Sequence, residues 1–257
     1  MSNPFIKNTA YTLLDLITLK KGIARNINGM KVRFPAKWSR YYPEDYESEN
    51  YIFLQQQVKA GMQIIDIGAH IGLFSACSSQ LTGATGRIIC FEPTPGTFSI
   101  LKDTLRLNHC DNVTAVQAAV SDKEGQAIFY VSSTAGCNSN SLIKNEWGGN
   151  PVGYDVKLVT IDSIVSANAI KPGLIKIDAE GAEQDVLKGG IKTFKDHKPV
   201  LILGLHPAFI KEKGDSLEAI WDLLESIPYK IKIDGKEMTK QDFSSRDLLF
   251  DVHCFAV

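Results

Sequence analysis

Short apolar runs alternate with segments of helical periodicity from residue 62 to the end of the chain. The apolar runs predict strands at Gln63–Ile67, Arg87–Phe91, Val113–Val120, Leu174–Ile177 and Val200–Leu205. Helices are expected between or after them, at Leu73–Leu81, Thr97–Asn108, Glu183–Phe194 and Ser216–Ile227. Short apolar strands separated by helices are typical of a parallel sheet covered on both faces. The pattern therefore predicts an α/β fold with a doubly wound, mostly parallel sheet.

Other segments depart from this alternation. Ala127–Val131 and Asp155–Ile161 are expected to be extra strands, separated by a polar loop, Ser132–Tyr154. Near the C-terminus, Tyr229–Ile233 and Phe250–Val257 resemble a closing pair of strands. We expect this pair to be antiparallel and to form one edge of the sheet.

The first sixty residues do not follow the alternation of strands and helices, and we treat 1–60 as an N-terminal extension of a main domain, 61–257. Leu13, Leu14 and Ile17 could lie on one side of a short helix. Ile23–Ile27 and Met30–Phe34 flank Asn28–Gly29, a pattern that predicts a hairpin with a primed turn. Residues 45–58 are expected to be helical, with Gly61 as a stop signal. The extension could cap the site, form a dimer contact or cover an edge.

Composition narrows the class of partner. The chain has 257 residues, 44% of them hydrophobic, which is enough for a large core. Its formal net charge of −1 lacks the basic excess of proteins that bind nucleic acid, so a small-molecule partner is expected. Five cysteines without a C-x-x-C pair argue against disulfides and zinc. No segment reaches the ~20 apolar residues of a membrane span, and no signal-peptide pattern is present. We therefore expect a cytoplasmic protein, monomeric or homo-oligomeric.

A glycine turn follows the first strand of the main domain. Gly68 and Gly72 allow the chain to turn tightly and to approach a ligand, with Ala69 between them. Their G-x-x-x-G spacing differs from the G-x-G-x-x-G that cradles a pyrophosphate. Asp66 would repel a pyrophosphate, but it could accept a charge-assisted hydrogen bond from the ammonium of S-adenosylmethionine. Glycines alone are weak evidence, and Asp66 could instead bond nearby turn amides.

The ends of the second and third strands carry further candidates for donor binding. Glu92 lies about 20 residues beyond the glycine turn, where a carboxylate can accept hydrogen bonds from ribose hydroxyls. A solvated strand-end acid is the alternative. The small residues Ala119, Val120 and Ser121 would leave room for an adenine ring.

The fourth and fifth strands end in polar residues at the same edge of the sheet. Asp178 and Glu180 could bind Mg²⁺ or position an acceptor hydroxyl. An ion pair with a lysine would explain Asp178 as well, and a helix N-terminus would explain Glu180. His206 follows the fifth strand, and as a neutral imidazole it could accept a proton. A buried histidine bonded to a carbonyl is the alternative.

These motifs resemble those of FkbM-type methyltransferases in order and spacing. They are Asp66-Ile67-Gly68-Ala69-x-Ile71-Gly72, Phe91-Glu92-Pro93, Ala119-Val120-Ser121-Asp122 and Lys176-Ile177-Asp178-x-Glu180-Gly181-x-Glu183. The resemblance implies a class I methyltransferase (Rossmann-like) fold, S-adenosylmethionine as donor, and O-methylation of a sugar, polyketide or similar metabolite. It places Asp66, Gly68 and Gly72 at the methionine part of the donor and Glu92 at the ribose. Asp178 and Glu180 would lie on the acceptor side.

One departure from the family pattern concerns the fifth strand. Relatives often carry an acid two residues before the terminal histidine, and here that position is Gly204. We therefore expect either His206 or Asp178 to take the proton of the acceptor hydroxyl. The competing functions are a nicotinamide-dependent oxidoreductase, a donor-binding interaction module without catalysis, and a methyltransferase acting on RNA or protein.

Overall fold

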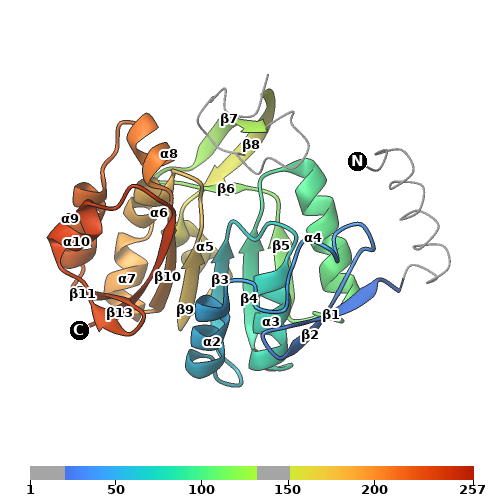
Figure 1. The fold of residues 1–257 in the computed structure, drawn as a ribbon. Coiled ribbons are helices and arrows are strands. Elements are labelled where there is room, and N and C mark those ends of the chain that lie inside the picture. Colours follow the sequence, from blue (N-terminus) through green and yellow to red (C-terminus); the bar gives the residue numbers. More distant parts are fainter. Residues whose placement is uncertain (1–20, 132–150) are drawn as a thin grey trace, which may run out of the picture.

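The computed structural model describes residues 21–131 and 151–257, so the expected helix near Leu13 and most of the loop 132–154 lie outside the described residues. The main sheet in the described part has eight strands, in the order β12-β11-β13-β10-β9-β3-β4-β5 (Figure 1). Its parallel strands are β3 (Gln63–Ile67), β4 (Arg87–Phe91), β5 (Val113–Val116), β9 (Leu174–Ile177) and β10 (Val200–Leu205). The predicted doubly wound α/β sheet is confirmed.

The antiparallel part of the sheet lies beside β10. Strand β13 (Phe250–Ala256) is inserted between β10 and β11 (Tyr229–Ile233) and runs antiparallel to both. The predicted pairing of the last two segments is therefore confirmed. The edge itself is formed by a two-residue strand, β12 (Lys236–Glu237), that the sequence pattern did not predict.

Helices cover both faces of the sheet, because alternate strand residues point to opposite sides. Ile65 and Ile67 of β3 belong to one buried cluster, whereas Ile64 belongs to another on the opposite face. On the Ile65 face lie α5 (Ile161–Asn168), α6 (Glu183–Lys188), α7 (Ile191–His197), α9 (Leu217–Ser226) and α10 (Lys240–Ser244). On the other face lie α2 (Ser48–Gln57), α3 (Leu73–Thr82) and α4 (Pro95–Leu107). The helix α8 (Pro207–Glu212) follows β10 directly.

The N-terminal hairpin packs on the same face as α3 and α4. Strands β1 (Ile23–Ile27) and β2 (Met30–Phe34) pair antiparallel around Asn28 and Gly29, whose φ angles of 48° and 82° are those of the predicted primed turn. Phe34 of β2 and Leu54 of α2 are fully buried in one hydrophobic cluster with Ile64 of the main sheet. Residues 21–58 therefore share a core with the sheet.

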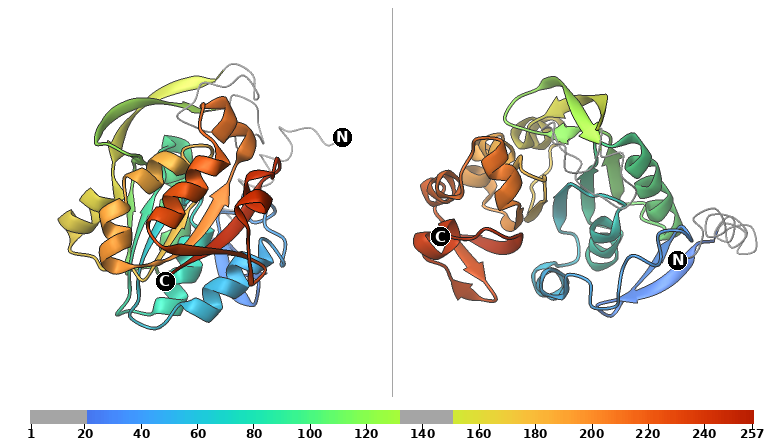
Figure 2. Two further views of the ribbon diagram at one scale, coloured as in Figure 1. Left: turned by 90° about the vertical axis from the view of Figure 1, so that its left-hand side faces the viewer. Right: turned by 45° about the horizontal axis from the view of Figure 1, so that its top comes forward.

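Two expected elements are each divided. The segment Val113–Val120 leaves the main sheet after Val116, and β6 (Ala119–Val120) joins β8 (Val152–Val159) and β7 (Gly125–Val131) in a small second sheet. The expected helix Glu183–Phe194 breaks into α6 and α7 at Gly189. A Cβ atom at Gly189 would lie 2.1 Å from the carbonyl oxygen of Ser121, so only glycine permits this close approach. The small sheet arches over the carboxyl ends of the parallel strands (Figures 1 and 2).

Candidate active site

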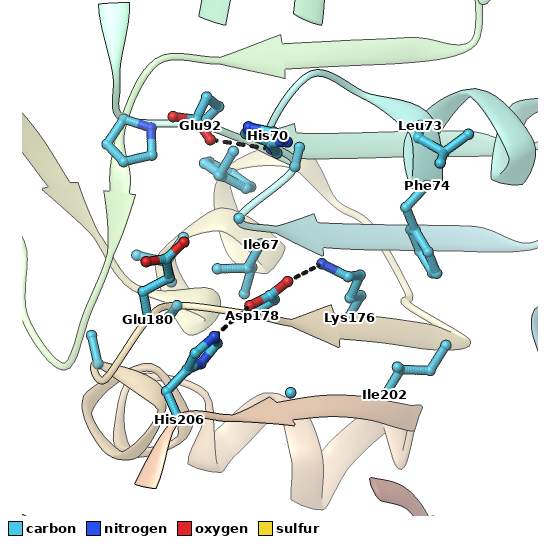
Figure 3. A pocket seen from close by; sticks show the side chains of 18 of the residues that line it. Ile67, His70, Leu73, Phe74, Glu92, Lys176, Asp178, Glu180, Ile202 and His206 are labelled. Carbon is cyan, nitrogen blue, oxygen red and sulfur yellow. Dashed lines mark hydrogen bonds and ion pairs between the residues drawn. The ribbon is translucent and has the colours of Figure 1, made fainter. Parts of the chain in front are cut away.

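A cavity of about 360 Å³ lies at the carboxyl ends of β3, β4, β9 and β10. Most of the residues expected at a site line it: Gly68, Ala69, Glu92, Ala119, Val120, Asp178, Glu180 and His206. Figure 3 shows several of these side chains facing one another across the strand ends. Three expected site residues do not line the cavity: Asp66, Gly72 and Ser121.

The turn after β3 is built from two glycines with different partners. Gly68 has φ +76°, and a Cβ atom there would lie 1.9 Å from the carbonyl oxygen of Asp178. This close approach joins the end of β3 to the end of β9. Gly72 has φ +90°, and a Cβ atom there would lie 2.5 Å from Leu101 of α4. Gly72 therefore permits the close packing of α3 against α4, and it does not itself line the cavity.

Asp66 lies beneath the cavity. Its side chain is fully buried and accepts a hydrogen bond of 2.6 Å from the hydroxyl of Ser75 in α3. Burial raises the pKa of Asp66, while Lys176 on the adjacent strand opposes that shift. Asp66 does not itself line the cavity, and its Oδ1 has no hydrogen-bond partner among the described residues.

Ser121 is likewise held away from the cavity. It is 3% exposed, its backbone amide donates to Val159 at 2.9 Å, and its hydroxyl donates to Asp122 at 3.3 Å. It therefore belongs to the junction between β6 and β8. Its neighbours Ala119 and Val120 line the cavity, and Ser121 does not.

Glu92 is a buried carboxyl held by backbone amides. His70 donates to its Oε2 at 3.1 Å and Thr94 to its Oε1 at 2.9 Å. Burial raises the pKa of Glu92 to about 7, although the two amides oppose the shift. The side chain is thereby fixed at the cavity wall beside the glycine turn.

A row of alternating charges crosses the ends of β9 and β10. The Nζ of Lys176 lies 3.1 Å from Oδ2 of Asp178, and Nε2 of His206 lies 3.7 Å from Oδ1 of the same carboxylate. On its other side, Nδ1 of His206 lies 2.8 Å from Oε1 of Glu183. Burial disfavours the charge of Asp178, but Lys176 and His206 outweigh it and lower the pKa of this carboxyl. Asp178 is therefore ionised and oriented.

His206 is protonated at neutral pH in this arrangement. Burial lowers its pKa, but the hydrogen bond to the fully buried Glu183 and the nearby Asp178 raise it to about 9. The expected neutral imidazole is thus not what the structure favours. His206 is better suited to hold Asp178 in place than to accept a proton.

Glu180 occupies the loop after β9. Its φ of 47° is in the left-handed region, and Gly181 follows with φ 99°. Burial raises the pKa of the Glu180 carboxyl to about 8. Among the described residues no group of three or more His, Cys, Asp or Glu side chains is arranged to hold a metal ion. Because Asp178 is already paired with Lys176, the Mg²⁺ expected at Asp178 and Glu180 does not fit this donor set.

Sequence reasoning missed a carboxylate that comes from β13. Asp251 pairs with Gly204 in the sheet, and a Cβ atom at Gly204 would lie 3.0 Å from its Oδ1 and 3.6 Å from Asp178. Asn50 of α2 donates to the other oxygen of Asp251 at 2.9 Å, and burial raises the pKa of Asp251 to about 6. The acid that is missing at Gly204 is thus matched by one on the neighbouring strand. The only signal in the sequence was the unusual glycine.

The N-terminal segment contributes one wall of the cavity. Tyr42, Tyr46 and Asn50 line it together with His70 of the glycine turn. The hydroxyl of Tyr42 lies 3.1 Å from Nδ1 of His70, and the rings of Tyr42 and Tyr46 meet edge to face with centroids 4.8 Å apart. No periodicity in the sequence marked these aromatic residues as site residues.

A family model described as the methyltransferase FkbM domain matches residues 66–231, which is more than half of the chain. Curated relatives include the methyltransferase sdnD of Sordaria araneosa, 29% identical over 70% of this chain and 78% of the relative. The hexuronic acid methyltransferase AglP of Haloferax volcanii is 26% identical over 69% of this chain and 74% of its own. Among solved structures, a candidate rRNA methylase from Clostridium thermocellum superposes with a TM-score of 0.51 at 11% identity, covering 82% of this chain and 95% of that one. This last similarity concerns the fold alone.

Proposed function

This chain belongs to the FkbM methyltransferase family, and we propose that it transfers the methyl group of S-adenosylmethionine to a hydroxyl of a sugar, polyketide or other small metabolite. The observation that carries the proposal is that Glu92 and Asp178 face one cavity from the ends of β4 and β9, the two strands that flank β3. A carboxylate for the donor's ribose and an ionised carboxylate for a hydroxyl are thereby brought together.

The donor fits the half of the cavity formed by β3, β4 and β6. Gly68 and Ala69 leave the turn open on the cavity side, and Glu92 offers its carboxyl to the ribose hydroxyls. Ala119 and Val120 form a small, apolar surface suited to an adenine ring. Asp66 and Gly72 act indirectly, by fixing the turn and the start of α3.

The acceptor fits the half formed by β9, β10 and the N-terminal wall. The sulfonium methyl is already electrophilic, so alignment of the attacking oxygen can contribute ~7–11 kcal/mol. Asp178 is held in one orientation by Lys176 and His206 and can accept a hydrogen bond from the acceptor hydroxyl. Residues 42–51 of the N-terminal extension would then close the acceptor pocket, since Tyr42 and Tyr46 line it.

Proton removal can involve either of two neighbouring carboxylates. Asp178 is the oriented one, whereas Asp251 is the more basic one, because burial raises its pKa to about 6. A general base contributes roughly 10²–10⁴-fold to the rate of such a transfer. We assign the orientation of the hydroxyl to Asp178 and the uptake of its proton to the pair that Asp178 forms with Asp251. The positive charge of His206 keeps Asp178 ionised and carries no proton step itself.

The charges of the cavity favour a neutral acceptor. Its described lining includes one lysine, Lys176, which is paired with Asp178, and His206, which is paired with Glu183. The lining also contains Glu47 and Asp251, so an anionic acceptor would meet further carboxyls without an unpaired cation. A hexuronic acid, the substrate class named for AglP, is therefore less suitable here than a neutral hydroxylated compound. The buried, free cysteines fit a reducing, cytoplasmic setting.

The proposal is tested by supplying labelled S-adenosylmethionine with a panel of neutral and acidic hydroxylated compounds. We expect transfer to a neutral member, and Asp178→Asn should lower kcat by roughly 10²-fold or more while the donor Kd changes less than about threefold. Asp251→Asn should remove the acidic limb of the pH–rate profile near pH 6. Full activity of both variants would contradict the assigned roles. Binding of the donor without its consumption in the presence of any member of the panel would favour a non-catalytic donor-binding module.

A further inference from the structure

Glu180 is an acid in the cavity for which the described residues provide no hydrogen bond or ion pair. Figure 3 shows its carboxyl pointing into the cavity from the loop after β9, with Glu92 on one side of it and His206 on the other. Three other cavity carboxyls are matched: Glu92 by two backbone amides, Asp178 by Lys176 and Asp251 by Asn50. The position of Glu180 is thus explained by no contact within the protein.

The loop is built to hold Glu180 in place. Glu180 adopts the left-handed region, which a residue other than glycine occupies at a cost. The next residue, Gly181, donates its amide to Oε1 of Glu183 at 3.0 Å, and a Cβ atom on it would lie 2.6 Å from Cβ of Phe209. The chain therefore accepts a strained backbone at the point where it presents an unpaired acid to the cavity.

The charged groups that face Glu180 come from four elements. They are Glu92 at the end of β4, Asp178 at the end of β9, Glu183 in α6 and His206 at the end of β10. The one cationic group among them, His206, is already shared by Glu183 and Asp178. Burial and these neighbouring acids raise the pKa of Glu180 to about 8, so at pH 7 the carboxyl is mostly neutral.

A cationic ligand would reverse this balance. If the donor's ribose lies at Glu92 and its methyl group points towards Asp178, as the proposed function requires, its sulfonium lies between them, in the region that Glu180 faces. We propose that Glu180 is the counter-charge of the donor's sulfonium and that it ionises when S-adenosylmethionine binds. The inference rests on the proposed function, and it makes Glu180 the residue that distinguishes donor from product.

The charges balance over the reaction. The oxygen–methyl bond forms as the sulfur–methyl bond breaks, and the electron pair of the broken bond stays on sulfur, which becomes neutral. The hydroxyl proton leaves through Asp178 and Asp251. Glu180, facing a neutral S-adenosylhomocysteine, regains from solvent the proton that it lost on donor binding. The cavity then holds the product without an ion pair, which favours its release.

The test compares S-adenosylmethionine with S-adenosylhomocysteine by isothermal titration between pH 6 and pH 8.5, in buffers of different ionisation enthalpy. The two ligands share the ribose and adenine, so the titration of Glu92 affects both, and the ratio of their Kd values reports the sulfonium. For the unchanged protein, we expect donor binding to strengthen relative to product binding as the pH rises towards 8. The ratio should change by up to about tenfold per pH unit. We also expect the donor to release more protons than the product at pH 7.

Two variants complete the test. Glu180→Gln has the same size and cannot ionise, so the ratio of the two Kd values should no longer change with pH. Binding of S-adenosylhomocysteine should change less than about twofold, which also shows that the variant is folded. Glu180→Asp retains the charge and should retain the pH dependence. An unchanged ratio and slope in Glu180→Gln would overturn the role of Glu180 and leave the proposed function intact. Failure of the unchanged protein to bind either ligand would overturn both.

Discussion

At the scale of single residues, the charge of each carboxyl in the site is set by its own neighbours. Asp178 is ionised because Lys176 lies 3.1 Å away, whereas Glu180 is mostly neutral because its pKa is raised to about 8. Both acids belong to one short motif and lie on the same loop. The sequence identifies them as a pair of acids. That one is ionised and the other neutral depends on neighbours on other elements, which spacing along the chain cannot show.

The pairing of His206 with Glu183 predicts a pH-dependent contribution to stability. The pKa of His206 is raised to about 9 from an ordinary value near 6.5, so the protonated form stabilises the folded state. This stabilisation is fully present below pH 6.5 and is lost as the pH rises through 9. Over that range it amounts to roughly 3 kcal/mol at most.

Urea unfolding of the unchanged protein and of His206→Gln between pH 6 and pH 10 measures this effect. The stability difference between the two should be largest at pH 6 and should shrink towards pH 10. His109→Gln, at an exposed position after α4, is the matched control and should show no such trend. A His206→Gln difference that stays constant over the range would show that the ion pair does not raise the pKa.

At the scale of elements, the strands were predictable and their junctions were not. Apolar runs identified β3, β4, β9 and β10 with the bounds that the structure has, because both faces of these strands are buried. The break between α6 and α7 depends on the close approach of Gly189 to Ser121, a contact between distant segments. The same reason explains why Asp66, Gly72 and Ser121 were expected in the cavity and lie outside it. Each is engaged by a helix or strand that only the folded chain brings near.

The junction of β3 and β9 at Gly68 yields a second prediction. Gly68→Ala places a Cβ atom 1.9 Å from the carbonyl oxygen of Asp178, so it must displace the loop that carries the acceptor-side acids. We expect a loss of roughly 3 kcal/mol or more in the free energy of unfolding, together with loss of donor binding. Urea unfolding and isothermal titration measure the two effects.

Gly214→Ala is the matched control for this substitution. Its φ of +87° is similar, but a Cβ atom there meets nothing within 4 Å, so only the backbone strain of roughly 1 kcal/mol is expected. Equal losses in the two variants would mean that strain alone matters at Gly68. A stable Gly68→Ala variant that still binds the donor would contradict the described approach of β3 to β9.

At the scale of the whole molecule, the carboxyl ends of the parallel strands form the floor of the cavity, and residues 42–51 contribute one of its walls. The described residues contain no helix long and apolar enough to cross a membrane. The class of fold followed from the alternation of strands and helices. The aromatic wall could not be predicted, because it is formed by a segment without clear periodicity that packs against the sheet from outside.

The overall charge predicts weak affinity for nucleic acid. With a formal net charge of −1, the chain has little capacity to release phosphate counterions. We expect no binding of a structured RNA in filter-binding assays at about 150 mM salt, in keeping with the ~10⁻⁴–10⁻⁶ M typical of non-specific contacts. Binding at nanomolar concentrations that weakens steeply with salt would favour a macromolecular acceptor over a small metabolite.

The central claim is that the cavity binds S-adenosylmethionine through Glu92, and isothermal titration tests it most directly. The unchanged protein should bind this donor at one site per chain and should not bind NAD. Glu92→Gln should weaken donor binding by roughly tenfold, because the amide offers the ribose hydroxyls one acceptor oxygen in place of the two of the carboxyl. Absence of donor binding, or binding of NAD that Glu92→Gln weakens instead, would contradict the account.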